Sequence, residues 1–362
     1  MKKHLKLCLV FLLLGSTSAF AQPELKAKFI KKNMEKVTKW QLEHPRHADT
    51  DWTNGAFYAG VVEAYKTTGK QWILDSLIAM GEAQNWEPAA RYDHADDIAI
   101  SQTYLAIYDI TKDRSIIEPT LNRLKKLQSV PGKEVANHGI TWWWCDALFM
   151  APPVLAKMAN ITDDNSLRVF NDKLYKECYD LLYNEEEDLF ARDASYLMDK
   201  NGKIKLEDNG KKIFWSRGNG WVMGGLVKLL QELPADYPNR PFYENLYKEM
   251  AAKLISIQQP DGLWRSSLLD PTSFPGGEAS GSGFDLYALA YGVNNGLLPS
   301  SYTPNIVKGW VALNGLVNEE GRVGWVQPIG ADPRRNFDKD SWEVFGSGAY
   351  LLAGSEVIKL KR

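Results

Sequence analysis

The protein has 362 residues, of which 44% are hydrophobic and 24% are charged, so its composition is that of a globular protein with one large domain or two small ones. Its formal net charge of -2 lacks the basic excess of proteins that bind nucleic acid or anionic membrane surfaces, so we expect neither partner. The 13 Trp residues favour a carbohydrate-handling protein only weakly, because a large core also uses Trp.

The N-terminal segment has the pattern of a secretory signal peptide over residues 1–21. Three Lys residues precede an apolar run over residues 7–14, and Ser18-Ala19-Phe20-Ala21 offers a cleavage site with small residues at the required positions. This run is too short to span a bilayer, and no later segment resembles a membrane span. We therefore expect a single catalytic domain over residues 22–362 in a periplasmic or secreted bacterial protein.

A loop containing Trp, Asp or Gly recurs along the rest of the chain, and each copy opens onto an apolar helix rich in small residues. The copies are separated by roughly 40–70 residues, which is the spacing of a helical hairpin with a variable loop. They cover residues 51–60, 93–100, 144–150, 215–224, 281–287 and 346–352. Between them, amphipathic helices are predicted, for example over residues 71–84 and 243–259.

Six apolar helices that alternate with six amphipathic ones predict an all-α fold, the (α/α)6 barrel, with six inner and six outer helices. We expect the functional residues to gather at the end where the inner helices begin, since free N–H groups and the helix dipole there also favour an anionic ligand. A polar hairpin is predicted over residues 184–212, at the rim of the barrel.

The most informative stretch runs from Trp142 to Pro153 and places one carboxylate, Asp146, among indoles and apolar side chains. Apolar surroundings raise the pKa of a carboxyl group, which is how an Asp becomes a general acid near neutral pH. Indole faces such as that of Trp144 are the usual platform for a sugar ring. The alternative is that Asp146 only caps the following helix.

A second pair of carboxylates, Asp96 and Asp97, precedes the apolar run that starts at Ile98. We expect one of them to cap the helix and the other to face Asp146 across a cleft. Two carboxylates across a cleft are the minimal catalytic set of a glycosidase. Ordinary capping by both residues is the alternative.

Further candidates for substrate binding are Arg217, with its two flanking Trp residues, and His138. Arg217 lies in a glycine-rich turn between Trp215 and Trp221, and an Arg held by aromatic rings can bind a carboxylate with two hydrogen bonds; a structural ion pair is the alternative. His138 precedes the Trp cluster and is either a hydrogen-bond donor to the substrate or a structural His.

The five His residues lack metal-ligand spacing, so we expect no metal and no cofactor. The two Cys residues beyond the signal peptide, Cys145 and Cys178, are expected to be buried free thiols.

The chain resembles the unsaturated rhamnogalacturonyl hydrolases of glycoside hydrolase family 105, which are related to the unsaturated glucuronyl hydrolases of family 88. The resemblance covers nearly the whole chain beyond the signal peptide. It is most specific in the motif from Trp143 to Met150, in the motif from Trp215 to Trp221, and in Asp96-Asp97-Ile98.

The resemblance implies a metal-free hydrolase of oligosaccharides that carry a Δ4,5-unsaturated uronic acid at the non-reducing end, the products of polysaccharide lyases. Asp146 matches the family's general acid/base, which protonates C4 and then helps to deliver water to C5. The resulting hemiketal opens and releases the next sugar. The family's second aspartate falls on Asp96 or Asp97, of which we favour Asp97.

The resemblance also places Trp215, Arg217 and Trp221 in the uronate site, where Arg217 would hold the carboxylate or a nearby hydroxyl. Arg192 follows Phe190 where many members carry a His, so it is a candidate substrate residue. The sugar next to the uronate stays open: galacturonyl-rhamnose, glucuronyl-rhamnose of algal sulfated polysaccharide, and glycosaminoglycan products all fit.

Two other functions are compatible with these residues. A conventional inverting glycosidase would use Asp97 as base and Asp146 as acid, with the carboxylates about 6.5–9.5 Å apart. A non-catalytic periplasmic protein would bind glycan through its Trp clusters. In each case the partner is an oligosaccharide, and we expect a monomer or a weak homo-oligomer.

Overall fold

The computed structural model describes residues 22–130, 138–198 and 201–361, so the predicted signal peptide lies outside the described residues. Six inner and six outer helices alternate along this part of the chain. The inner helices are α2 (Trp52–Thr68), α5 (Ser101–Thr111), α8 (Pro152–Thr162), α10 (Ser216–Glu232), α12 (Ala279–Asn294) and α14 (Val344–Val357). The outer helices are α1 (Ala27–Glu43), α3 (Gln71–Ala83), α6 (Glu118–Ser129), α9 (Asn165–Leu182), α11 (Arg240–Ile257) and α13 (Thr303–Asn314).

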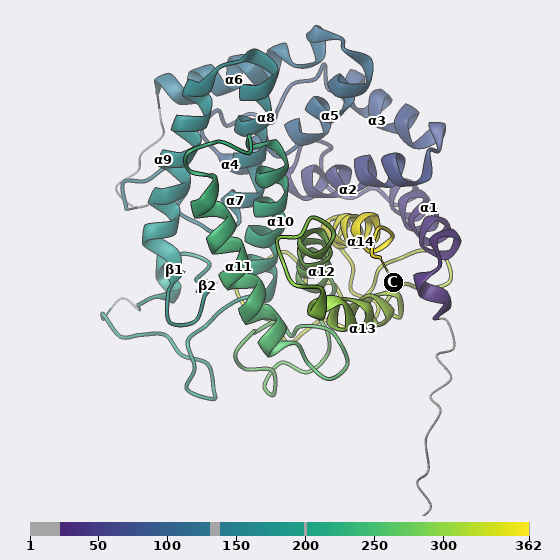
Figure 1. The fold of residues 1–362 in the computed structure, drawn as a ribbon, viewed down its shortest axis with the longest axis vertical. Helices are drawn as coiled ribbons and strands as arrows, with labels where there is room; N and C mark the ends of the chain where they lie inside the picture. The colour runs from purple at the N-terminus through teal and green to yellow at the C-terminus, as the bar shows by residue number, and fades with distance from the viewer. Residues whose placement is uncertain (1–21, 131–137, 199–200, 362) are drawn as a thin grey trace, which may run out of the picture.

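The inner helices form a closed ring. Contacts run from α2 to α5, from α5 to α8, from α8 to α10, from α10 to α12, from α12 to α14, and from α14 back to α2. The outer helices lie around the periphery, as Figure 1 shows. The predicted (α/α)6 barrel is therefore confirmed, and the helices predicted over residues 71–84 and 243–259 correspond to α3 and α11.

Small residues bring the inner helices together backbone to backbone. A Cβ atom added to Gly60 of α2 would lie only 2.4 Å from the carbonyl oxygen of Gly348 in α14. A Cβ atom on Gly348 would lie 2.5 Å from the carbonyl oxygen of Ala56. Only glycine fits at such an approach, and every residue of α14 is buried. This explains why the inner helices are rich in small residues and apolar all round.

Two inner helices are interrupted close to their starts. The short helix α4 (Ala95–Ile98) precedes α5, and α7 (Ala147–Met150) precedes α8. Pro152 and Pro153 open α8 and have no N–H to continue the hydrogen-bond ladder of α7. The amide of Gln102 in α5 donates instead to the carbonyls at the end of α7, at 2.8 and 3.3 Å. Because of these two interruptions, the short helices α4 and α7 lie at one end of the ring. They carry or directly follow the candidate carboxylates Asp96, Asp97 and Asp146.

The predicted polar hairpin begins with two short antiparallel strands, β1 (Tyr183–Asn184) and β2 (Leu189–Phe190), in which Tyr183 pairs with Phe190. The chain then passes directly beside the turn that contains Asp146. The N–H of Cys145 donates to the carbonyl of Arg192 at 2.9 Å, and Trp144 bridges to Asp193. This pairing fixes the position of Arg192 next to Asp146.

The two thiols are free and buried, as predicted. Within the described ranges, no helix is long and apolar enough to cross a membrane. No group of three or more His, Cys, Asp or Glu side chains in the same part of the chain is arranged to hold a metal ion. The absence of a cofactor stays a prediction.

Candidate active site

Asp146 immediately precedes α7 and is almost completely buried, with 8% of its surface exposed. Its side chain makes no capping hydrogen bond, so the interpretation of Asp146 as a simple helix cap is wrong. One carboxylate oxygen, Oδ2, lies 3.4 Å from Nε of Arg192 and accepts a weak hydrogen bond from the thiol of Cys145 at 3.6 Å. Burial raises the pKa of Asp146, and the positive charges of Arg192 and Arg217 only partly oppose the rise. Such a carboxyl group binds a proton more tightly than an exposed one does, as a general acid requires.

Asp96, in the short helix α4, is the carboxylate that interacts with Asp146. Burial first, and then the negative charge of Asp146, raise the pKa of Asp96 to about 7. Nδ1 of His94 lies 3.6 Å from Oδ2 of Asp96. The buried Asp146 and the partly buried Asp96 thus interact electrostatically, and such a pair of carboxyl groups is a common arrangement in acid/base catalysis.

Asp97, by contrast, is bound to Arg91. The backbone N–H of Arg91 donates to Oδ2 of Asp97 at 2.7 Å, and the guanidinium donates to Oδ1 from Nε at 3.0 Å and from Nη2 at 2.5 Å. Both carboxylate oxygens are therefore occupied, and Asp97 holds the loop before α4. This arrangement does not support our preference for Asp97 as the second site carboxylate, and it favours Asp96.

Arg192 is the guanidinium nearest to the carboxylate pair. Its Nη1 donates to Oδ2 of Asp193 at 2.7 Å, and its Cζ lies 5.6 Å from the ring centre of Trp143. Burial disfavours its charge, but the carboxylates of Asp146 and Asp193 outweigh burial and raise its pKa. The structure thus brings Arg192 to Asp146, where it can stabilise the charge left when the proton departs.

His94 and Trp144 complete the surroundings of the pair. Their rings pack with centroids 4.5 Å apart, and Trp144 also contacts Trp143 at 5.0 Å. Burial, followed by the charge of Arg91, lowers the pKa of His94 to about 4, so its imidazole is neutral at physiological pH. Neither His94 nor Trp143 is among the residues predicted from the sequence to form the site, although both lie within two residues of one that is.

Arg217 lies beneath the site and has no exposed surface. Its Nη1 and Nη2 donate to the carbonyls of Gln327 and Pro328, at 2.7 and 2.9 Å. The guanidinium is held between the rings of Trp215 and Phe345, at 4.4 and 4.6 Å from their centres. The predicted contact of Arg217 with a substrate carboxylate is not available in this arrangement, because the segment that follows Val326 covers it. Arg217 acts here as a structural donor, and its charge reaches Asp146 from below.

The two Trp residues that flank Arg217 are also buried. Nε1 of Trp215 donates to the side-chain oxygen of Gln327 at 3.1 Å, and 2% of Trp215 is exposed. Trp221 has no exposed surface and packs against Trp52, Phe149, Phe284 and Phe345. Neither ring offers a free face for a sugar, so both belong to the floor of the site and the core of the barrel.

His138 is exposed and has a left-handed backbone, with φ of 60°. Residues 131–137, which precede it, lie outside the described part of the chain. Among the described residues, no contact joins His138 to the carboxylate pair. Its role in binding stays a prediction.

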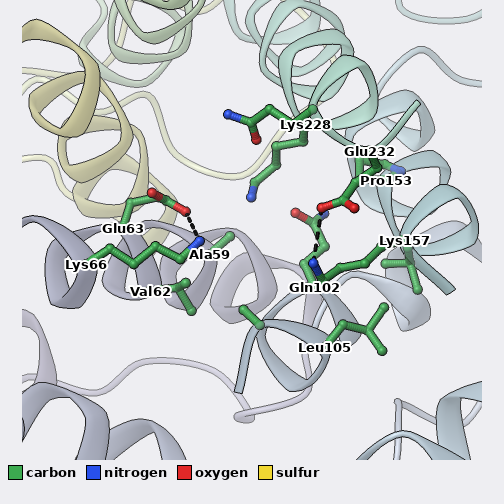
Figure 2. Close-up of a pocket in the computed structure, with 13 residues that line it drawn as sticks. Ala59, Val62, Glu63, Lys66, Gln102, Leu105, Pro153, Lys157, Lys228 and Glu232 are labelled. Carbon is green, nitrogen blue, oxygen red and sulfur yellow. Dashed lines mark hydrogen bonds and ion pairs between the residues drawn. The ribbon is translucent and has the colours of Figure 1, made fainter. Parts of the chain in front are cut away.

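A separate small cavity lies between α2, α5, α8 and α10. It has a volume of about 50 Å³ and is lined by Glu63, Lys66, Gln102, Lys157, Lys228 and Glu232, among others. Figure 2 shows these side chains converging. Lys66 bonds Glu63 at 2.8 Å, and Lys157 bonds Glu232 at 3.1 Å. Because several of these residues lie in the last turns of α2 and α10, this cavity is at the opposite end of the ring from Asp96 and Asp146.

A ring of inner helices that presents the buried Asp146, the partly buried Asp96, a neutral His and an Arg beside indoles is typical of a carbohydrate-processing hydrolase. The chain belongs to Glycosyl Hydrolase Family 88, which it matches over residues 26–361. It is 45% identical to the "Unsaturated 3S-rhamnoglycuronyl hydrolase" of Formosa agariphila, over 99% of this chain and 98% of that protein. A protein of the same description from Alteromonas sp. is 35% identical, over 85% of this chain and 77% of that protein.

Solved structures share the whole barrel. A family 88 glycosyl hydrolase from Bacteroides vulgatus superposes with a TM-score of 0.85 at 29% identity, covering 92% of this chain and 100% of that chain. A structure described as a polysaccharide lyase superposes with a TM-score of 0.84 at 33% identity, covering 92% of this chain and 97% of that chain. The predicted family resemblance and the predicted hydrolase of unsaturated uronyl oligosaccharides are confirmed. The roles of individual residues stay predictions.

Proposed function

We propose that this protein removes a Δ4,5-unsaturated uronic acid from the non-reducing end of lyase-generated oligosaccharides in which the next sugar is a 3-sulfated rhamnose. The sequence left the next sugar open, and the choice of sulfated rhamnose is supported by the relative that is 45% identical over 99% of the chain. In the name of that relative, we read 3S as a sulfate ester at O3. The acid/base assignment is supported by one observation, the buried pair of Asp146 and Asp96.

The reaction is the hydration of a vinyl ether. Asp146 donates its proton to C4 of the unsaturated ring, and the double bond becomes an oxocarbenium ion at C5. The Asp146 carboxylate then accepts a proton from water as the water oxygen bonds to C5. The resulting hemiketal opens by cleavage of the bond between C5 and the ring oxygen, which leaves a ketone at C5 and a hemiacetal at C1. The hemiacetal collapses to an aldehyde and releases the next sugar as an alcohol.

Each neighbour of Asp146 has a role in this cycle. Burial disfavours the carboxylate form of Asp146 and so raises its affinity for the proton that it donates. Arg192, 3.4 Å away, stabilises the carboxylate once the proton has moved to carbon. Asp96 holds the second proton of the pair and binds a ring hydroxyl or the water. The partly exposed face of Trp143 supports the sugar ring.

The test is the ultraviolet absorbance of unsaturated disaccharides incubated with the purified protein, because hydration destroys the conjugated C4=C5 carboxylate. We expect the wild type to discharge the absorbance and Asp146→Asn to leave it unchanged while keeping its melting temperature within a few degrees. A conventional glycosidase would release the unsaturated sugar with the double bond intact. A lyase would instead create absorbance from the intact polysaccharide. A glycan-binding protein would leave every substrate unchanged, and its Asp146→Asn variant would bind like the wild type.

We also propose that the mature protein begins at residue 22, is periplasmic or secreted, and is a monomer or a weak homo-oligomer. The basic and apolar pattern of residues 1–21 supports export. Mass spectrometry of the protein exported by a bacterial host tests the cleavage position. Light scattering of the purified protein at several concentrations tests its oligomeric state.

A further inference from the structure

Three positive side chains surround one tyrosine beside the catalytic pair. Tyr196 ends a short 3-10 helix (Ala194–Tyr196), in which the N–H of Ser195 donates to the side chain of Asp193 at 2.9 Å. Nζ of Lys205 lies 4.6 Å from the centre of the Tyr196 ring. The charges that act on the Tyr196 hydroxyl group are those of Asp332, Asp193, Arg192 and Arg334. The cluster is therefore assembled from the segment after β2 and from the segment that covers Arg217.

Arg334 is held in place but keeps free donors. Its backbone N–H donates to Oγ of Ser266 at 2.9 Å, and its Nε forms an ion pair with Oδ1 of Asp332 at 2.7 Å. Its side chain is 47% exposed, and among the described residues its two terminal nitrogens make no hydrogen bond. An oriented guanidinium with two unused donor nitrogens can donate parallel hydrogen bonds to two oxygens of a sulfate, phosphate or carboxylate group.

Lys205 adds a second free charge. It is exposed, and its described contact is with the face of Tyr196 rather than with a carboxylate. Of the three cations, Arg192 is already bound to Asp146 and Asp193. Arg334 and Lys205 therefore outnumber their single carboxylate partner, Asp332. Because Arg192 is bound to Asp146 and its charge also acts on Tyr196, this excess positive charge lies next to the candidate active site.

We propose that Arg334 and Lys205, beside Tyr196, form a subsite for the sulfate ester of the sugar that follows the unsaturated uronate. The inference rests on the proposed function, since it assumes that the uronate ring lies against Asp146. The uronate carboxylate is the other oxyanion in the same substrate, and the experiment separates the two.

The experiment compares Arg334→Gln and Lys205→Gln on the sulfated unsaturated disaccharide and on the same disaccharide after chemical desulfation. A hydrogen bond to a charged group contributes about 1.5–3 kcal/mol, which corresponds to a fall in kcat/KM of about 10- to 100-fold for Arg334→Gln on the sulfated substrate. We expect a smaller fall, about 3- to 10-fold, for Lys205→Gln, because its charge is exposed. On the desulfated substrate both variants should stay within about twofold of the wild type, and the losses should lie in KM.

Arg114→Gln is the matched control, because Arg114 is also an exposed arginine beside a carboxylate but lies before α6 on the outer ring. It should leave both substrates unaffected. A second readout without turnover is the Kd of the sulfated disaccharide for Asp146→Asn with and without Arg334→Gln, which should rise by the same factor as KM.

Equal losses on the sulfated and the desulfated substrate would show that these cations bind the uronate carboxylate and would overturn the proposal. Unchanged kinetics on both substrates would overturn it as well. If the wild type discharges the absorbance of neither disaccharide, the proposed function itself fails, and this outcome is distinct from both others.

Discussion

Replacing Arg192 by Gln removes the positive charge nearest to Asp146 and should shift the pH dependence of the reaction. Arg192 lowers the pKa of both site carboxyl groups, Asp146 and Asp96, against the larger effect of burial. Without it, the general acid keeps its proton to higher pH. We therefore expect the alkaline limb of the kcat/KM profile to move to higher pH.

The size of the shift follows from the geometry. Two unit charges 3.4 Å apart interact by about 5 kcal/mol at an effective dielectric constant of about 20. Water around the partly exposed Arg192 reduces this value, and a carboxyl group beside an Arg typically shifts by about 1–3 pKa units. We expect a shift of about 1–2 pH units. The plateau rate should fall by about 10- to 100-fold, because the carboxylate formed in the reaction loses its stabilising charge.

The assay is the loss of absorbance of the unsaturated disaccharide between pH 4 and pH 9 for the wild type, Arg192→Gln and Arg192→Lys. Arg192→Lys keeps the charge, so its alkaline limb should lie closer to that of the wild type. Thermal unfolding of each variant at the ends of the range separates inactivation from unfolding. An alkaline limb that stays in place in Arg192→Gln, or moves to lower pH, would refute the role of Arg192 in setting the proton affinity of the acid.

Three other predictions concern stability. Arg217→Met should lower the free energy of unfolding by about 3–5 kcal/mol in urea titrations, because it leaves the carbonyls of Gln327 and Pro328 without donors. A loss of activity with unchanged stability would instead favour a direct role of Arg217 in substrate binding. Asp97→Asn should lower the free energy of unfolding by about 1–2 kcal/mol, a modest loss because the partner Arg91 is more than half exposed. It should retain hydration activity in the fraction that stays folded. Asp96→Asn should instead lose activity without a comparable change in melting temperature. Burial lowers the pKa of Lys228 to about 8 from an unfolded value of 10.5, so the unfolded state binds more protons between these values. The contribution of Lys228 to stability should therefore rise with pH from about 8 to 9.5, seen as a difference from Lys228→Met in urea titrations at each pH.

The architecture and the candidate general acid could both be predicted from the amino-acid sequence. The alternation of apolar and amphipathic helices is a local property of the chain, and burying the apolar ones inside a ring of amphipathic ones is the packing that removes their surfaces from water. Asp146 could be found in the same way, because its own neighbours in the sequence, Trp144 to Met150, provide the apolar environment that raises its pKa.

Which neighbouring residues face the candidate site could not be predicted from the sequence, because it depends on contacts between distant parts of the chain. Asp96 and Asp97 are consecutive, and successive side chains point about 100° apart around a helix, so their order carries no information about which one meets Asp146. Arg91 decides the matter by binding Asp97. In the same way, an Arg between two Trp residues has the same sequence pattern whether its side chain is exposed to a substrate or buried under another segment of the chain. Arg217 is covered by carbonyls 110 and 111 residues later in the chain, a contact that only folding creates.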